Sequence, residues 1–83
     1  MTKTLTHICQ GTCSREITVT LEDGIIRDVR FLGGCDGNTQ GIMHLVKGMK
    51  AEDVIAHCKG INCRGKGTSC PDQLAQALEE AMA

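Results

Sequence analysis

Six cysteines stand out in this chain of 83 residues, because thiolates bind metals, attack electrophiles and exchange electrons. Four of them lie near glycines or a predicted turn: Cys13, Cys35, Cys63 and Cys70. Glycines beside a ligand let the backbone approach closely and turn its N–H groups toward sulfur. The spacing is not the paired CxxC of zinc ribbons, so a shared site depends on the fold. If the fold brings them together, four thiolates suit tetrahedral zinc or an iron–sulfur cluster.

Cys70 is expected at the N-terminus of a helix. Thr68 and Ser69 can accept hydrogen bonds from the free N–H groups of a first helical turn, and Pro71 fits that turn. Asp72 completes a capping-box-like pattern with Ser69. The helix dipole there favours a thiolate, the form that binds metal or attacks electrophiles. The alternative interpretation is a capped helix with a small buried cysteine.

The other two cysteines and the three histidines have different settings. Cys58 continues the apolar stripe of a predicted helix and is interpreted as a core residue. Cys9 ends a weakly predicted strand and can face either side of it. His7 is interpreted as a surface residue of that strand, with a spare ligand near Cys9 as the alternative. His44 and His57 lie beside apolar helical stripes and are expected to be partly exposed.

Length and composition limit the fold. Residues 1–83 make one small domain with a modest core, and Phe31 is the one aromatic residue. Domains of this size often need a disulfide or a metal as a staple. Residues 1–8 contain no continuous apolar run, so no signal peptide is expected. A reducing cytoplasm is therefore the expected compartment, where thiols stay reduced or bind metal.

Charge and composition also limit the partners. The net charge of −1 gives no general attraction to nucleic acid or to an anionic membrane. Trp and Tyr are absent, so base stacking is unsupported as well. No apolar segment approaches the length of a membrane span. We therefore expect a protein partner, of unidentified kind, and neither nucleic acid nor membrane.

The sequence predicts three antiparallel strands, residues 3–9, 15–21 and 25–32. Residues 15–21 and 25–32 are predicted from hydrophobic alternation, and residues 3–9 from their threonines with Leu5 and Ile8. Asp23 and Gly24 are a strong signal for a two-residue hairpin turn between the second and third strands. In the third strand Ile25, Val29 and Phe31 are expected on the apolar face. One apolar face requires a covering layer.

Three helices are predicted to supply that layer. The first follows a cap at Asp36 or Asn38 and stops at Gly48, the second runs from about Ala51 to Lys59, and the third runs from Cys70 or Pro71 to near the end. The expected inward residues are Ile42, Leu45, Val46 and Met49 in the first helix and Val54, Ile55 and Cys58 in the second. The sequence thus predicts an α+β domain, a three-stranded antiparallel meander covered by three helices.

This meander makes a shared cysteine site possible. The start of the second strand and the end of the third lie at the same end of the sheet, which places Cys13 near Cys35. The loop before the last helix can bring Cys63 and Cys70 to that end.

Two segments resemble a known family. Residues 34–38 read GCDGN and residues 67–75 read GTSCPDQLA. Both are similar to the small TSCPD-domain proteins, named from the run Thr68 to Asp72, and the resemblance extends from about Cys13 to the last helix. A related domain ends the cobalamin-dependent ribonucleotide reductases, which implies an accessory role to such a reductase as one alternative. The reductase itself needs a large barrel, a radical cysteine and a cofactor site, so no nucleotide reduction is expected of these 83 residues alone.

A second, more distant resemblance is to the U-type iron–sulfur scaffold proteins. It covers a cysteine before a hairpin, a glycine-cysteine turn after Phe31, and a cysteine that opens the last helix. The resemblance implies three ligand cysteines: Cys13, Cys35 and Cys70. The chain has Arg15 where the scaffolds have an acidic residue and Ser69 where they have histidine. Cys63 could replace the missing ligand and complete a closed four-sulfur site.

Three functions stay open on these grounds. The first is a small metal-binding module, a scaffold or accessory protein with zinc or an iron–sulfur cluster. The second is a thiol redox protein in which Cys63 and Cys70 exchange electrons, with Arg64 and Lys66 favouring the thiolates. The third is a plain interaction domain whose cysteines bind nothing.

Overall fold

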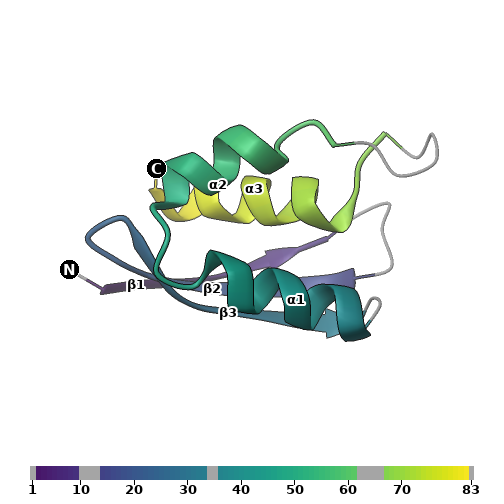
Figure 1. The fold of residues 1–83 in the computed structure, drawn as a ribbon, viewed down its shortest axis with the longest axis horizontal. Helices are drawn as coiled ribbons and strands as arrows, with labels where there is room; N and C mark the ends of the chain where they lie inside the picture. Colours follow the sequence, from purple (N-terminus) through teal and green to yellow (C-terminus); the bar gives the residue numbers. More distant parts are fainter. Residues whose placement is uncertain (1, 10–13, 34–35, 62–66, 83) are drawn as a thin grey trace.

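The computed structural model describes residues 2–9, 14–33, 36–61 and 67–82. Three strands precede three helices: β1 (Thr2–Ile8), β2 (Ser14–Glu22), β3 (Ile25–Gly33), α1 (Asp36–Val46), α2 (Ala51–Cys58) and α3 (Cys70–Met82). The strands form one antiparallel sheet in the order β1-β2-β3. α3 packs on β1 and β2, α2 packs on α3, and α1 packs on β3 (Figure 1). The predicted α+β fold, a three-stranded meander with three helices, is confirmed.

The predicted hairpin between β2 and β3 is confirmed. Both central residues of its turn have positive φ, 52° at Asp23 and 80° at Gly24. Such a turn matches the right-handed twist of the flanking strands, and Asp-Gly adopts it at low cost.

A bulge in β3 changes the face that this strand buries. Thr20 pairs with Asp28, but Leu21 pairs with Ile26, so Arg27 is an extra residue opposite β2. The extra residue reverses the alternation on its N-terminal side. As a result Ile26 is fully buried and Ile25 only partly, which corrects the prediction that Ile25 leads the apolar face.

The core lies between the sheet and α3, and it is almost entirely aliphatic. The sheet contributes Ile17, Val19, Leu21, Ile26 and Val29, and the helices contribute Val46, Ala51, Val54, Leu74, Ala77, Leu78 and Ala81. Short alanine side chains on α3 let this helix approach the sheet closely. Ile55 and Cys58 pack against the core from α2, beside the buried Val54, so the predicted inward face of α2 is confirmed.

The predicted inward face of α1 is only partly right. Val46 is buried and Ile42 packs against the core, but Leu45 is 77% exposed and Met49 is exposed too. α1 contacts β3 along one narrow side, and Leu45 lies away from that side. Met49 lies beyond the helix, in a segment where its carbonyl accepts a hydrogen bond from the Ile26 N–H.

Both helix stops predicted from glycine are confirmed. Gly48 follows α1 with a φ of 91°, and Gly60 follows α2 with a φ of 86°. The left-handed conformation costs glycine little, and it turns the chain out of the helix. Among the described helices, none is long and apolar enough to cross a membrane.

Candidate functional site

Only one of the four predicted metal ligands, Cys70, lies within the described residues. Cys13, Cys35 and Cys63 lie outside them, so the four-sulfur site stays a prediction. Within residues 2–9, 14–33, 36–61 and 67–82, no group of three His, Cys, Asp or Glu side chains could hold a metal ion. The structure does, however, describe Ser14 directly after Cys13, Asp36 directly after Cys35, and Ile61 and Gly67 on either side of the segment that carries Cys63.

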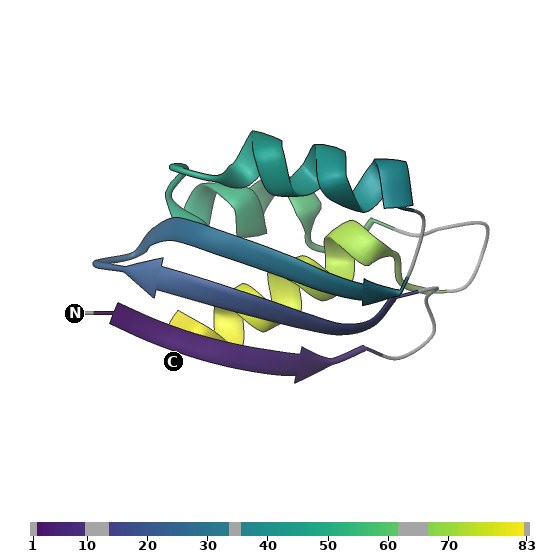
Figure 2. The same ribbon diagram turned by 90° about the horizontal axis from the view of Figure 1, so that it is seen from below.

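The described neighbours of these cysteines lie at one end of the molecule. Ser14, which follows Cys13 in the sequence, pairs with Gly33, and Gly33 precedes Cys35 by two positions. α3 begins with Cys70 at the same end of the sheet, on the right in Figures 1 and 2. The meander therefore brings the flanking backbone together as the sequence predicted.

Cys70 opens α3, as predicted, and Ser69 caps the helix. The Asp72 N–H donates a hydrogen bond of 3.1 Å to the Ser69 Oγ, which satisfies one of the free donors of the first turn. Ser69 is buried, and Cys70 is half-buried. The thiol of Cys70 is thus held on the first turn of a well-capped helix.

The carboxylate of Asp72 binds the two ends of the loop before α3. The Gly60 N–H donates to Asp72 Oδ1 at 2.7 Å, and the Thr68 hydroxyl donates to Asp72 Oδ2. Gln76 Nε2 adds a third hydrogen bond, at 3.1 Å. The Thr68 hydroxyl and then the Gly60 N–H hold the pKa of Asp72 below its ordinary range, although its burial opposes this. The main role of Asp72 is therefore to hold the two ends of this loop together, more than to complete a capping box. We call this arrangement the loop clamp.

Hydrogen bonds continue from Asp72 to His7 on β1. Thr68 gives its only hydroxyl proton to Asp72, so its oxygen must accept from Gln73 Nε2, 2.8 Å away. Gln73 consequently turns Oε1 toward His7 Nε2, at 2.8 Å, and that ring nitrogen must carry a proton. His7 Nδ1 lies 2.9 Å from Glu80 Oε2. These bonds join β1, α3 and the segment that follows α2.

We call this set of side chains the polar network: His7, Thr68, Asp72, Gln73, Gln76 and Glu80. His7 is only 9% exposed, so its interpretation as a surface residue was wrong. It faces α3 because β1 passes beneath that helix. The sequence pattern does not indicate the role of Gln73, because the motif around this residue predicts only a helix start.

Cys9 lies beside Cys70, which the sequence did not indicate. Its thiol is partly buried and packs against the core. Burial, together with the like charges of the nearby Cys70 and Glu16, raises the pKa of Cys9 to about 11. Cys9 is therefore mainly a neutral thiol near neutral pH, a poor nucleophile beside the first turn of α3.

Cys58 behaves as predicted. It packs against the core from α2, and burial raises the pKa of its thiol. His44 and His57 are exposed on their helices, which agrees with their expected partial exposure.

A three-stranded sheet with α3 across it and a Thr-Ser-Cys-Pro-Asp helix start define a small α+β domain in which Cys70 opens α3 and Cys9 lies beside it. The chain belongs to the TSCPD domain family, whose sequence profile matches residues 1–82. No curated protein and no solved structure matches the chain. The similarity to the U-type scaffolds thus stays a prediction.

Proposed function

We propose that this TSCPD domain is a metal-binding module that serves a protein partner as a scaffold or accessory. Cys13, Cys35, Cys63 and Cys70 would bind one zinc ion or one iron–sulfur cluster. The observation that carries the proposal is the pairing of Ser14 with Gly33 at the end of the sheet where α3 begins. That pairing supports a common position for three cysteines that are far apart in the sequence.

Chain lengths are compatible with such a site. Consecutive Cα atoms are about 3.8 Å apart, and directly opposed residues of antiparallel strands are about 5 Å apart. Cys13 is one residue from Ser14, and Cys35 is two residues from Gly33. Both cysteines are therefore within two residues of one strand pair, a separation along the chain that is compatible with a shared ion.

The clamp at Asp72 supports the assignment of Cys63. The two groups that donate to its carboxylate, Gly60 and Thr68, flank the segment that carries Cys63. A loop with fixed ends loses less conformational entropy when one of its side chains binds a ligand. Asp72 would thus preorganise Cys63 for a site next to Cys70.

Cysteine alkylation in the presence and absence of metal tests this ligand set. Reduced, metal-free protein is alkylated with and without one equivalent of zinc under nitrogen, and each site is read by peptide mass. We expect zinc to slow the reaction of Cys13, Cys35, Cys63 and Cys70 together. Cys9 and Cys58 serve as internal controls whose rates should not change.

Each other pattern has a definite meaning. Protection of Cys63 and Cys70 alone would contradict the four-sulfur site and favour the thiol redox function. Protection that includes Cys9 in place of Cys13 or Cys35 would show that the ligand set is wrong. If zinc changes the rate at none of the six cysteines, zinc binding is contradicted, and the same experiment with a reconstituted cluster would then decide the iron–sulfur alternative.

A further inference from the structure

β1 is an edge strand whose outward backbone groups can be identified. The Cys9 N–H donates to the Arg15 carbonyl at 2.8 Å, which sets the phase of the ladder between β1 and β2. N–H and C=O of one residue point to the same side in an antiparallel pair, and the side alternates along the strand. Four residues therefore direct both groups away from β2: Thr2, Thr4, Thr6 and Ile8.

Side-chain distances agree with this phase. Thr4 Oγ1 lies 3.3 Å from Thr20 Oγ1, and Thr6 Oγ1 lies 3.0 Å from Thr18 Oγ1. Such close approach is typical of pairs that do not exchange backbone hydrogen bonds. The N–H and C=O groups of Thr4 and Thr6 are thus directed to the open edge.

This edge has few of the features that normally prevent strand addition. β1 is seven residues long, contains no proline, and pairs with β2 in continuous register without a bulge. The charge of Lys3 would disfavour the addition of another strand unless a carboxylate paired with this lysine. A carboxylate lies at the same edge, because Glu80 of α3 reaches His7 on β1 and is still half exposed.

We propose that β1 pairs antiparallel with β1 of a second copy of the chain, with the two-fold axis beside Leu5. In this register Thr4 exchanges backbone hydrogen bonds with Thr6 of the partner subunit, and Thr2 does so with Ile8 of the partner subunit. The two sheets join into one continuous sheet, and all seven residues of each β1 are paired.

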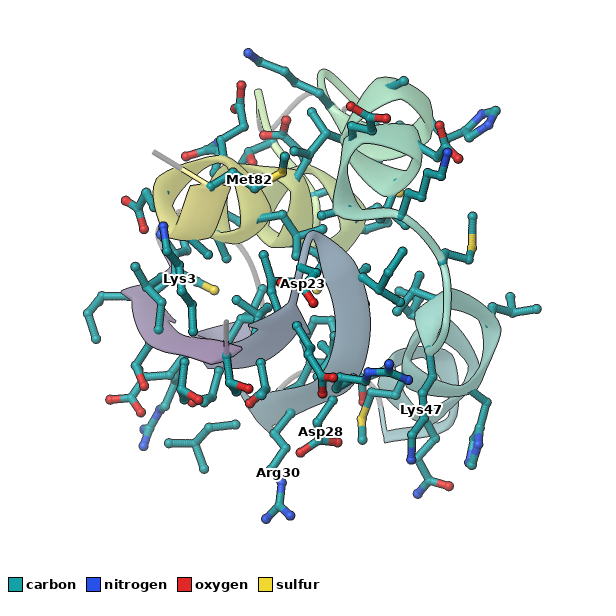
Figure 3. The ribbon with its side chains drawn as sticks, turned by 90° about the vertical axis from the view of Figure 1, so that its left-hand side faces the viewer. Lys3, Asp23, Asp28, Arg30, Lys47 and Met82 are labelled. Carbon is teal, nitrogen blue, oxygen red and sulfur yellow. The ribbon has the colours of Figure 1, made fainter. Side chains whose placement is uncertain are left out.

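Charge complementarity favours a second copy of the chain as the partner that pairs with this edge strand. Lys3 of one subunit faces His7 of the partner subunit, beside Glu80 of the partner subunit, and the two-fold axis repeats this pair. Lys3 is exposed and lies on the side of the sheet that α3 covers (Figure 3). Leu5, which is half-buried in one chain, meets its own copy at the axis between the two charge pairs.

A hollow of about 660 Å³ between β1 and α3 gives the incoming lysine room. Its walls are formed by Thr6, His7, Ile8, Gln73, Gln76 and Glu80. A register shifted by two residues keeps the hydrogen-bond phase, but it leaves part of each strand unpaired. It also sets Lys3 against Leu5 of the partner subunit or against Cys9 of the partner subunit, depending on the direction of the shift. The register centred on Leu5 is therefore the one that satisfies both the backbone and the charges.

Analytical ultracentrifugation of the full chain, from micromolar to millimolar concentration, tests the proposal. We expect a monomer–dimer equilibrium. Lys3→Glu and Glu80→Lys should each weaken dimerisation by roughly tenfold or more, because attraction becomes repulsion at both pairs. The double variant K3E/E80K should restore it. Arg30→Glu, a charge reversal on the exposed side of β3, is the matched control and should change nothing.

Thr4→Pro gives a second test that spares the monomer. Proline at this position removes an N–H that points away from β2, so the internal ladder stays intact. Dimerisation should be lost while the monomer keeps its thermal unfolding transition. In the wild type, hydrogen exchange at the Thr4 and Thr6 amides should slow as concentration rises.

Three results would overturn the proposal. One is a monomer at every concentration, which would also be the outcome if the edge accepts a strand of another protein only. Another is a dimer that Thr4→Pro leaves unchanged, because the interface would then lie elsewhere. The last is failure of K3E/E80K to recover what both single variants lose, since Lys3 and Glu80 would then not meet.

Discussion

If the proposed site binds its metal, removal of that metal by a chelator is expected to lower the melting temperature by about 20 °C or more. Structural zinc sites contribute folding free energy directly, often on the order of 10 kcal/mol in small domains. Even about 5 kcal/mol corresponds to such a shift for a domain of this size, at roughly 4–8 °C per kcal/mol. The metal should therefore account for much of the stability of the fold.

The composition of the core explains why the dependence should be strong. Four of its buried side chains are alanines: Ala51, Ala75, Ala77 and Ala81. Phe31, the one aromatic residue, is only partly buried. A core of small aliphatic groups buries little apolar area for each residue, and small domains have little stability in reserve.

Scanning calorimetry under nitrogen, before and after chelation, measures the effect. Adding zinc back should restore the original transition. The Cys70→Ser variant is the control, because a chelator should not shift its transition if the ligand set is already broken. Identical transitions for metal-loaded and stripped wild-type protein would contradict a structural metal.

The second large effect is expected at Asp72. Asp72→Ala should lower the free energy of unfolding by about 3 kcal/mol, because hydrogen bonds to charged groups contribute roughly 1.5–3 kcal/mol each. Asp72 is only 6% exposed, and loss of its carboxylate leaves the Gly60 N–H, the Thr68 hydroxyl and Gln76 Nε2 without their acceptor. Urea unfolding followed by circular dichroism measures the change.

Asp53 on α2 offers a matched control. It is an exposed aspartate in the first turn of a helix, so Asp53→Ala should change the free energy of unfolding by less than about 0.5 kcal/mol. Equal losses for Asp53→Ala and Asp72→Ala would show that the loop clamp contributes nothing specific.

The contribution of Asp72 should depend on pH in a definite direction. Its hydrogen bonds with Thr68 and Gly60 lower its pKa in the folded protein relative to the unfolded chain. A lowered folded pKa gives stability that is fully present above the ordinary aspartate pKa of about 4 and is lost as the pH falls through the folded value. The stability difference between wild type and Asp72→Ala should therefore shrink below about pH 4, and a constant difference would contradict this role.

The sequence predicted the elements that depend on local chemistry. Asp23 and Gly24 indicated the hairpin because few other pairs adopt two successive positive φ angles easily. Ser69 and Pro71 indicated the start of α3 because helix capping involves neighbouring residues. Such signals lie within a few residues, so a single sequence contains them.

Other features depend on residues that only the fold brings together. The hydrogen bond from His7 to Gln73 joins residues 66 positions apart, and no local pattern announces it. The position of Cys9 beside Cys70 arises in the same way, from the end of β1 meeting the start of α3. The bulge at Arg27 could be suspected from broken alternation, but its effect on Ile26 needed the register.

The metal content of protein purified without oxygen tests the central claim most directly. Zinc and iron are measured by mass spectrometry, with an absorption spectrum to recognise a cluster. We expect about one zinc ion or one cluster per chain, lost in Cys70→Ser and kept in Cys58→Ser. Near-zero zinc and iron in the wild type, or full metal content in Cys70→Ser, would contradict a metal centre at the start of α3.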